Sequence, residues 1–361
     1  MSQANTFGKA LKVTFFGESH GVAIGAVIDG FPAGFPVNFP LIDSMISQRR
    51  PISNFETKRK EQDKVEFLSG IDNNISNGSP IAFIIRNTDK RSEDYADLKN
   101  VFRPGHADYV YYKKYGLLPQ AGGGRASGRE TIARVVAGAL AVDFLRQRNI
   151  DIISYVSAIG AVGIKEYGKW YPEKDIFASP LRCPELHVQA EMQKLIDEVV
   201  ASNDSIGGKI TTLVKGLPAG IGEPLFEKLN TVLSMALLSI PGAKGIDFGE
   251  GFSGIHLKGS QYNDELTQKN GAVEFVSNHS GGIQAGISNG NMLIMNTVFR
   301  PASSIGIEQN TIDVSGKPIK VTIKGRHDAC YIPRVAIVAT SMAAIALMDL
   351  FLQNKNFERK L

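Results

Sequence analysis

Cysteine is scarce in this sequence, and the motifs of several common enzyme classes are missing. The 361 residues include only Cys183 and Cys330, which excludes a dense disulfide framework, and their spacing is not that of a metal site. We therefore expect a reducing compartment, the cytoplasm, and no bound metal. The first eight residues contain no basic stretch followed by an apolar core, so we expect no secretory signal.

A strong excess of charge of either sign is also missing. The net charge is +4, charged residues make up 21% and hydrophobic residues 43%, which is ordinary for a soluble globular protein. A nucleic-acid partner therefore has no compositional support, although arginines gathered in one cleft could bind a polyanionic small molecule.

Long apolar runs are rare, and one stretch, residues 335–352, needs an interpretation. Polar residues including Asp349 interrupt it, and the preceding Pro333 suits the first turn of a helix. We expect a core helix over residues 333–353 and no membrane span.

Glycine is plentiful, and its densest cluster precedes an amphipathic pattern. Gly122-Gly123-Gly124-Arg125-Ala126-Ser127-Gly128-Arg129-Glu130-Thr131 leads into apolar residues at helical spacing, and Ser127 and Glu130 have the spacing of a capping box. Free N–H groups at the start of this helix, beside Arg125 and Arg129, would form an anion site; the alternative is a simple tight turn. A P-loop is excluded because Arg129-Glu130 stand where lysine and serine or threonine are required.

Histidines recur in polar turns at strand ends. His20 lies in Gly17-Glu18-Ser19-His20-Gly21 after an expected strand at residues 11–16, and His106 lies in Arg103-Pro104-Gly105-His106-Ala107-Asp108. One such histidine is usually structural, but two together indicate chemistry. Arg300-Pro301-Ala302-Ser303-Ser304 could be an oxyanion or phosphate clamp. Arg326 and Asp328, in Gly325-Arg326-His327-Asp328, form either a structural ion pair or part of a site.

The expected elements indicate an α+β fold without a linker. A weak repeat relates residues 27–35 to residues 214–221, each a strand followed by Gly-x-Pro-Ala-Gly, and predicts two related strand–helix halves. We expect sheets with helices between or beside them. The further expected strands are 26–28, 80–86, 152–159, 292–299 and 319–323, the helices 41–50, 187–202 and 225–239, and the irregular stretches 88–100 and 167–185.

Five segments, in order along essentially the whole chain, resemble the signatures of the chorismate synthase family. They are residues 17–21, 103–108, 122–131, 277–282 and 325–328. The resemblance implies a single β-α-β sandwich domain over residues 1–361. It implies a lyase that converts 5-enolpyruvylshikimate 3-phosphate to chorismate and phosphate by 1,4-anti elimination, the last step of the shikimate pathway towards aromatic amino acids. It also implies reduced FMN (FMNH2) as cofactor and a homotetramer. The flavin is reduced either by NADPH on the enzyme or by an external supply.

The resemblance further implies roles for individual residues. His20, next to Ser19, would give a proton to the leaving phosphate, His106 would protonate or stabilise the reduced flavin, and Asp328 would assist proton removal at the N5 side of the flavin. The implied substrate-binding residues are Arg49, Arg103, Arg129 and Arg326. The implied FMN-binding residues are Arg125, Ala126, Ser127, Gly242, Ala285, Arg300, Pro301, Ala302, Ser303, Ser304 and Arg326.

Some positions depart from the family pattern. Ala126 replaces a usual serine, Gly128 a usual alanine and Ala285 a frequent glycine. Asn54 stands where an arginine often binds phosphate or a nicotinamide nucleotide, and Lys58 or Arg59 could substitute. Two alternatives are a binding protein for flavin or phosphorylated metabolites, which would not need both histidines and Asp328, and a phosphotransferase, for which the P-loop lysine and magnesium ligands are missing.

Overall fold

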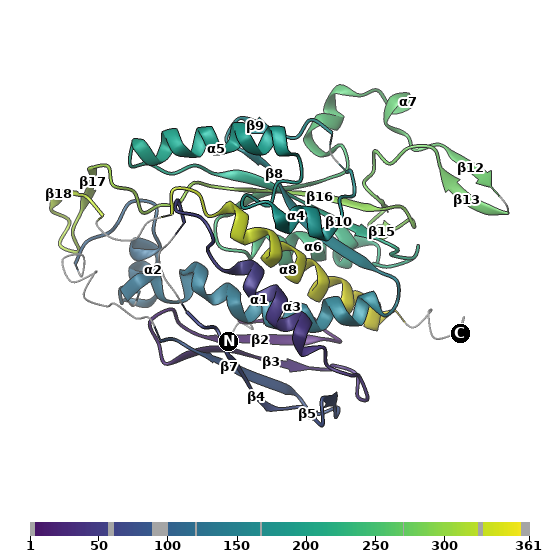
Figure 1. The fold of residues 1–361 in the computed structure, drawn as a ribbon, viewed down its shortest axis with the longest axis horizontal. Coiled ribbons are helices and arrows are strands. Elements are labelled where there is room, and N and C mark those ends of the chain that lie inside the picture. The colour runs from purple at the N-terminus through teal and green to yellow at the C-terminus, as the bar shows by residue number, and fades with distance from the viewer. Residues whose placement is uncertain are drawn as a thin grey trace.

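Two antiparallel sheets enclose a layer of helices (Figure 1). The computed structural model describes residues 4–56, 61–88, 100–119, 121–166, 168–269, 271–323 and 328–354. Sheet 1 has the strand order β1-β2-β3-β7-β4 and sheet 2 the order β11-β16-β10-β8-β9. A hydrophobic cluster with members from Leu11 to Leu350 joins both sheets and the helices into one core, as expected for a single α+β domain.

Each sheet turns apolar side chains towards the helices. In β2, Val13 and Phe15 are buried while Lys12 is exposed, the alternation of a strand with one covered face. The strands of sheet 1 are β1 (Thr6–Phe7), β2 (Lys12–Gly17), β3 (Ala23–Asp29), β4 (Val65–Ser69) and β7 (Ile81–Arg86). Those of sheet 2 are β8 (Asp151–Ile159), β9 (Val162–Gly163), β10 (Gly208–Lys215), β11 (Ala243–Phe248) and β16 (Leu293–Phe299).

Four helices form the middle layer, and two of them pack at very close range. These helices are α1 (Phe39–Arg49), α3 (Thr131–Arg146), α6 (Leu229–Leu238) and α8 (Ile332–Gln353). Gly138 of α3 faces Ser341 of α8 so closely that a Cβ on the glycine would overlap the serine. By length and composition α8 could cross a membrane, but 89% of its most apolar window is buried inside the domain. The expected core helix is confirmed.

The two halves of the chain repeat one order of elements. β2-β3-α1-β4-β7-α3 is followed by β8-β10-α6-β11-β16-α8. The predicted turn echo is present in the backbone, because Gly30 and Gly216 have φ of 82° and 81°. A serine then closes each turn: Ser76 donates to the Pro32 carbonyl and Ser288 to the Pro218 carbonyl, both at 2.6 Å. The prediction of two related halves is confirmed.

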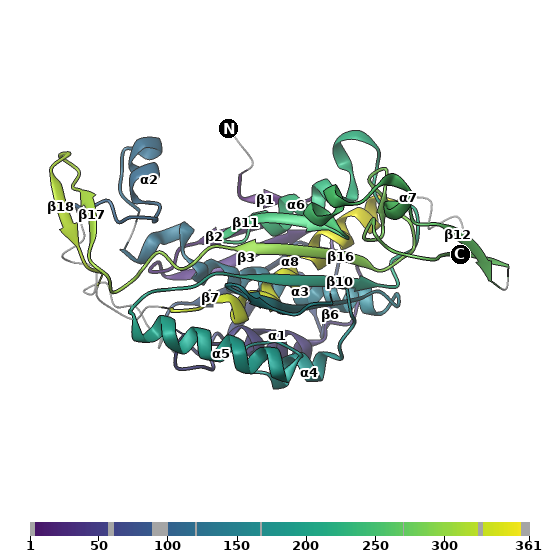
Figure 2. The same cartoon turned by 90° about the horizontal axis from the view of Figure 1, so that it is seen from above.

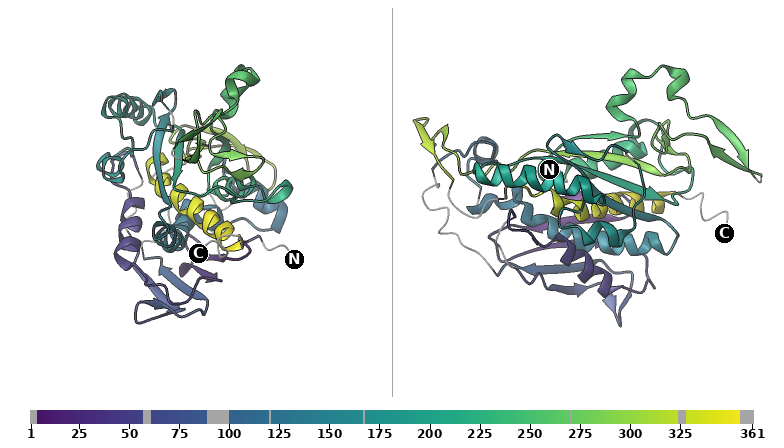
Figure 3. Two further views of the ribbon diagram at one scale, coloured as in Figure 1. Left: turned by 90° about the vertical axis from the view of Figure 1, so that its right-hand side faces the viewer. Right: turned by 45° about the horizontal axis from the view of Figure 1, so that its top comes forward.

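Further elements lie outside the sandwich. α4 (Glu173–Ala178) lies beside α3, to which it is joined by the ion pair of Glu173 with Arg146, and α5 (Leu186–Ala201) lies along the β8–β9 end of sheet 2 (Figure 3). α2 (Asp108–Tyr115) and the hairpin of β17 (Gln309–Ile312) and β18 (Pro318–Val321) project at one end of the molecule (Figure 2). α7 (Gly259–Tyr262) and the hairpin of β12 (Leu266–Lys269) and β13 (Ala272–Phe275) project at the other. Two short hairpins pair β5 (Ile71–Asp72) with β6 (Ile75–Ser76) and β14 (Ile283–Gln284) with β15 (Ile287–Ser288).

The start of the central helix differs from the prediction. Two 3₁₀ segments, Ala121–Ala126 and Gly128–Glu130, precede α3, which begins at Thr131. The Ser127 hydroxyl accepts the Arg129 N–H at 3.4 Å, but the Glu130 carboxylate binds Arg134 at 3.0 Å instead of returning to the cap. The reciprocal capping box was therefore a wrong prediction.

Other differences concern short or glycine-rich elements. α4 lies within the stretch expected to be irregular, and the helix expected from residue 225 begins at Leu229, after a 3₁₀ turn at Leu225–Glu227. β11 was not predicted, because the glycines within it and on both sides of it, at residues 242, 245 and 249, are typical of turns. Most of the expected loop at residues 88–100 lies outside the described residues.

Candidate active site

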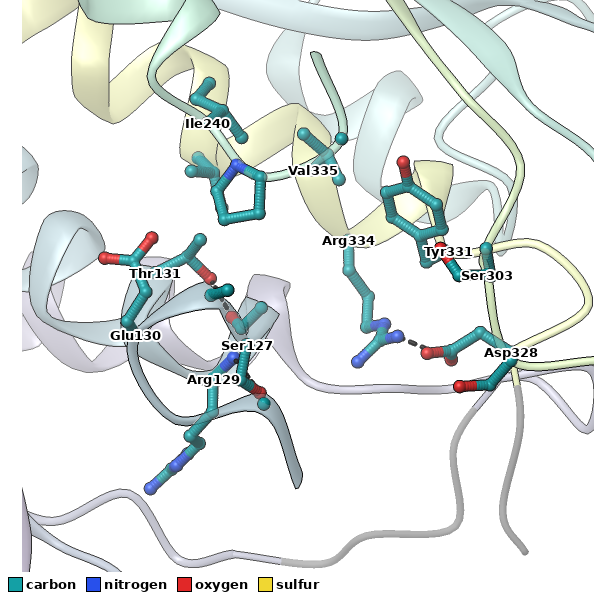
Figure 4. A pocket seen from close by; sticks show the side chains of 18 of the residues that line it. Ser127, Arg129, Glu130, Thr131, Ile240, Ser303, Asp328, Tyr331, Arg334 and Val335 are labelled. Atoms are coloured by element: carbon teal, nitrogen blue, oxygen red, sulfur yellow. Dashed lines mark hydrogen bonds and ion pairs between the residues drawn. The ribbon is translucent and has the colours of Figure 1, made fainter. Parts of the chain in front are cut away.

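A cleft of about 1120 Å³ opens where the N-terminal ends of α3 and α8 meet (Figure 4). Loops from both halves of the chain surround it: the turn after β2, the end of α1, the turn before α2, the glycine-rich segment, the turn after α6 and the turn after β16. The sandwich therefore brings together segments that are hundreds of residues apart in the sequence.

The described lining of the cleft is rich in positive charge. Its nine cationic side chains are Arg49, Arg50, Arg103, Arg125, Arg129, Arg134, Lys244, Arg300 and Arg334, and its four carboxylates are Glu61, Asp63, Glu130 and Asp328. Guanidinium groups donate to phosphate and carboxylate oxygens in pairs of hydrogen bonds. The cleft is therefore suited to a small molecule with several negative charges.

Arg49 and Arg129 are held in place at the foot of α3. Arg49 donates through Nε to Thr131 Oγ1 at 2.9 Å and through Nη2 to the Gly128 carbonyl at 2.8 Å. Burial, followed by the positive charges of Arg129 and Arg334, lowers the pKa of Arg49 to about 9. This crowding of cations would be relieved by a bound anion.

Arg129 is buried among acceptors but not saturated. It donates to Asp63 Oδ1 at 2.5 Å and to Asn87 Oδ1 at 3.1 Å, and Glu61 lies 3.6 Å from Nη2. Its Nη2 is buried without a hydrogen bond, an uncommon state for a charged donor. The Glu61 carboxylate is the acid beside this atom.

Arg103 is bound to an acid of its own turn. The Asp108 carboxylate accepts its Nε at 2.7 Å and its Nη2 at 2.8 Å, and both side chains are buried. This ion pair closes the turn of residues 103–108, in which His106 lies.

The hydrogen bonds of His106 define its protonation. Nδ1 lies 3.0 Å from the Pro104 carbonyl, which can only accept, so Nδ1 carries the proton. Nε2 of the neutral ring then accepts the Ser304 hydroxyl at 2.8 Å. Burial, and then the charge of Arg103, lower the pKa of His106. At neutral pH the ring is therefore uncharged, with its acceptor nitrogen directed at the serine turn.

The serine turn at residues 300–304 closes over the histidine turn. Arg300 donates to Ser303 and, at 3.1 Å, to the Gly105 carbonyl, to which Ser303 Oγ also donates at 2.7 Å. Tyr331 anchors the turn by donating to the Arg300 carbonyl at 2.7 Å.

His20 reaches the cleft from the turn after β2. Ser19, fully buried beneath it, has its Oγ 3.0 Å from His20 Nδ1. Arg125 holds this turn from the other side by donating to the Gly17 carbonyl at 3.2 Å, and it also donates to Asn5 Oδ1 at 2.8 Å. The sequence-predicted His20, His106 and Asp328 all line one cleft.

Sequence reasoning missed several residues of the cleft. Arg334 binds Asp328 Oδ1 at 2.5 Å, Arg134 stands on the corresponding turn of α3, and Tyr331 lies beside Gly242. Ile240 and Val335, which Figure 4 labels, and also Pro241 and Val338 give the cleft an apolar wall. Their position in the helices could have identified the two arginines. Arg134 lies three residues after the start of α3 at Thr131, and Arg334 lies two residues after the start of α8 at Ile332, so both are in the first turn of a helix that points at the cleft.

Three predicted residues are not part of the described lining: Ser19, which is buried beside His20, Ala285 and Arg326. Ala285 lies in the turn of the β14–β15 hairpin at φ 52°, beside the start of α6, whereas the cleft lies at the end of that helix. Its left-handed backbone explains why glycine suits this position. Arg326 lies outside the described residues, as do Lys58 and Arg59, and Asn54 is exposed in the turn after α1.

Comparison with known proteins gives a consistent result. The chorismate synthase family model matches residues 11–352. The chorismate synthase of Bacteroides thetaiotaomicron is 46% identical over 97% of this chain and 98% of its own, and that of Phocaeicola vulgatus is 45% identical over 96% and 98%. A crystal structure of chorismate synthase has a TM-score of 0.75 and 27% identity, covering 96% of this chain and 92% of that one. The chain belongs to the chorismate synthase family.

Proposed function

We propose that the cleft eliminates phosphate from 5-enolpyruvylshikimate 3-phosphate to form chorismate, with reduced FMN bound beside the substrate. Family membership makes the chain a lyase of the last step of the shikimate pathway. The observation that carries the detailed proposal is one cleft holding nine cationic side chains together with His20, His106 and Asp328.

The residues present fit FMN. A cleft of about 1120 Å³ exceeds the usual size of a single-ligand site and suits two small molecules. The apolar wall matches a flavin ring, and the guanidinium groups match its phosphate. Arg125, Ala126, Ser127, Gly242, Arg326 and residues 300–304 would hold it. When bound, reduced FMN would lend electron density to the substrate and recover it, so that the reaction has no net redox change.

The substrate brings one phosphate and two carboxylates, which we assign to the guanidinium groups. Arg49 and Arg129 offer guanidinium groups that are fixed in place at the foot of α3, and both line the cleft. We propose that Arg103 and Arg326 complete this set. Asp108 already takes two of the Arg103 donors, so a substrate anion would use the remaining ones.

We assign the proton at the leaving phosphate oxygen to His20. The Ser19 hydroxyl beside Nδ1 orients the ring, which supports delivery of a proton from a defined direction. The C–H bond breaks at the far end of the 1,4 system and its electron pair forms a new double bond there, the existing ring double bond shifts towards the phosphate end, and the C–O bond breaks with its electron pair going to phosphate.

We assign the remaining proton transfers to His106, which would protonate or stabilise the reduced flavin, and to Asp328, which would assist proton removal. His106 has a lowered pKa, so once protonated it is a stronger acid than an ordinary imidazole and can return a proton readily. Ser304 holds its Nε2. Asp328, oriented by Arg334, would accept the proton removed from the substrate side.

We further propose a cytoplasmic homotetramer that acts on small molecules and binds neither nucleic acid nor membrane. Its flavin would be reduced by NADPH or supplied as FMNH2.

The test is anaerobic phosphate release from 5-enolpyruvylshikimate 3-phosphate with photoreduced FMN. His20→Ala, His106→Ala and Asp328→Ala should each lose turnover by about a hundredfold or more while still binding FMN. His187→Ala, at an exposed histidine on α5, is the matched control and should keep full activity. A parent protein that binds FMN but releases no phosphate would contradict the proposal.

A further inference from the structure

We propose that Arg334 is a positioning residue, which holds the Asp328 carboxylate and ties its segment to the turn after α1. The inference rests on the proton-accepting role proposed above for Asp328. It concerns a residue that none of the sequence motifs singled out.

Arg334 lies between two acids of different segments. Its Nη2 is 2.5 Å from Asp328 Oδ1, and its Nε is 3.1 Å from Glu56 Oε1 (Figure 4 draws the first contact). The guanidinium side chain is 18% exposed and the Glu56 side chain 0%, so solvent screens the Glu56 contact little.

Glu56 is itself fixed by the backbone of its own turn. Its Oε2 accepts the N–H groups of Ile52 at 2.9 Å and Ser53 at 3.1 Å. The Ala329 N–H donates to the Phe55 carbonyl at 3.0 Å, so the two segments are also joined through their backbones. Arg334 thus connects the segment that follows Arg49 to the segment that contains Asp328.

The charges favour positioning over substrate binding. Two carboxylates, Glu56 and Asp328, already face the Arg334 guanidinium. Burial raises the pKa of Glu56 and Arg334 opposes this rise. Removing Arg334 would leave a buried carboxylate uncompensated and the Asp328 carboxylate without this donor.

The related half of the chain supplies a matched control. Ile132-Ala133-Arg134-Val135 on α3 corresponds to Ile332-Pro333-Arg334-Val335 on α8. Arg134 also lines the cleft, but its partners are Glu130 at 3.0 Å and Ser239. Replacing Arg134 therefore removes one positive charge from the cleft, as replacing Arg334 does, but leaves the contact with Asp328 intact.

The kinetic test compares Arg334→Gln, Arg334→Lys and Arg134→Gln with photoreduced FMN. Arg334→Gln should lower kcat by about tenfold to a hundredfold with KM for the substrate little changed, because a misplaced group slows the chemical step. Arg334→Lys should recover part of kcat, since it keeps the charge but cannot span both acids. A large rise in KM with unchanged kcat, or the same kcat loss in Arg134→Gln, would overturn the inference.

A second test does not depend on turnover. Urea unfolding of the FMN-bound protein is compared for the parent, Arg334→Gln, Asp328→Asn and the double variant. The double variant's midpoint should fall by less than the sum of the two single shifts; additive shifts would overturn the inference. A parent without turnover would contradict the proposed function alone, because this cycle would still report the contact. Should Arg334→Gln not fold, the same cycle is run in a Glu56→Gln background, where no buried carboxylate is left unpaired.

Discussion

His106 illustrates how burial and two hydrogen bonds select one state of a side chain. The Pro104 carbonyl fixes the proton on Nδ1, and Ser304 occupies Nε2. Protonating the folded protein must break the Ser304 arrangement and place a charge near Arg103 and Arg300. The unfolded chain has no such penalty, so it binds the proton more readily.

This difference predicts a pH dependence of stability. Because the pKa of His106 is lowered in the folded state, its contribution to stability is complete above the unfolded value and is lost as the pH falls below about 6.5. Between about pH 8 and about pH 5.5 the parent should lose more unfolding free energy than His106→Gln, because only the parent carries this histidine. Urea titrations at both pH values measure it, with His187→Gln as control. Equal losses in parent and His106→Gln would contradict the assigned tautomer and burial.

At the scale of elements, a close contact joins α3 and α8, the two helices whose N-terminal ends line the cleft. Gly138 lets the helices approach until Ser341 fills the space that a side chain would occupy. Gly138→Ala should therefore cost about 1–3 kcal/mol of unfolding free energy, against the helix propensity that favours alanine. Thermal or urea unfolding checks this value.

Gly245→Ala is the matched control for the helix contact. A Cβ on Gly245 would meet nothing within 4 Å, so this variant should keep nearly the parent stability. If Gly138→Ala were as stable as Gly245→Ala, the two helices would have to be further apart than the structure has them.

The elements that could be predicted from sequence are those with a clear period. The strands β3, β7, β8 and β16 and the helices α3, α5 and α8 follow apolar spacing and were found within a few residues. β11 and α4 could not be, since β11 contains and is preceded by glycines and α4 is only six residues long and follows Pro172. The capping box failed because Arg134 competes for Glu130.

Site residues that lie in a recognisable sequence motif could be predicted. Those that reach the site only through contacts between distant segments could not. His20, His106 and Asp328 lie in glycine-rich signatures and meet in one cleft as expected. Arg334 and Glu56 carry no local signal, because their contact joins segments almost 280 residues apart. Ala285 was grouped with the cleft by resemblance, while the fold of this chain sets it at the far end of α6.

At the scale of the whole molecule, the related halves predict matched effects of mutation. Ser76 and Ser288 are buried, and each accepts a backbone N–H, from Phe35 at 3.0 Å and from Ile221 at 2.8 Å, besides donating to a proline carbonyl. Ser76→Ala and Ser288→Ala should each cost about 1–3 kcal/mol and differ little from one another. The exposed Ser202→Ala is the control in urea unfolding. A large cost at one serine alone would mean that the halves share geometry but not energetics.

The net positive field of the cleft belongs to no single residue and predicts a dependence on salt. Nine cationic side chains against four carboxylates attract a substrate with a phosphate and two carboxylates, and added salt screens that attraction, the Debye length falling from about 10 Å at 0.1 M to about 3 Å at 1 M. Calorimetry should therefore record affinity for 5-enolpyruvylshikimate 3-phosphate falling at least several-fold over this range, and affinity for shikimate, which lacks the phosphate and one carboxylate, falling less. Equal salt dependence for both ligands would mean that binding relies on short, shielded contacts at Arg49 and Arg129 and that the wider field contributes little.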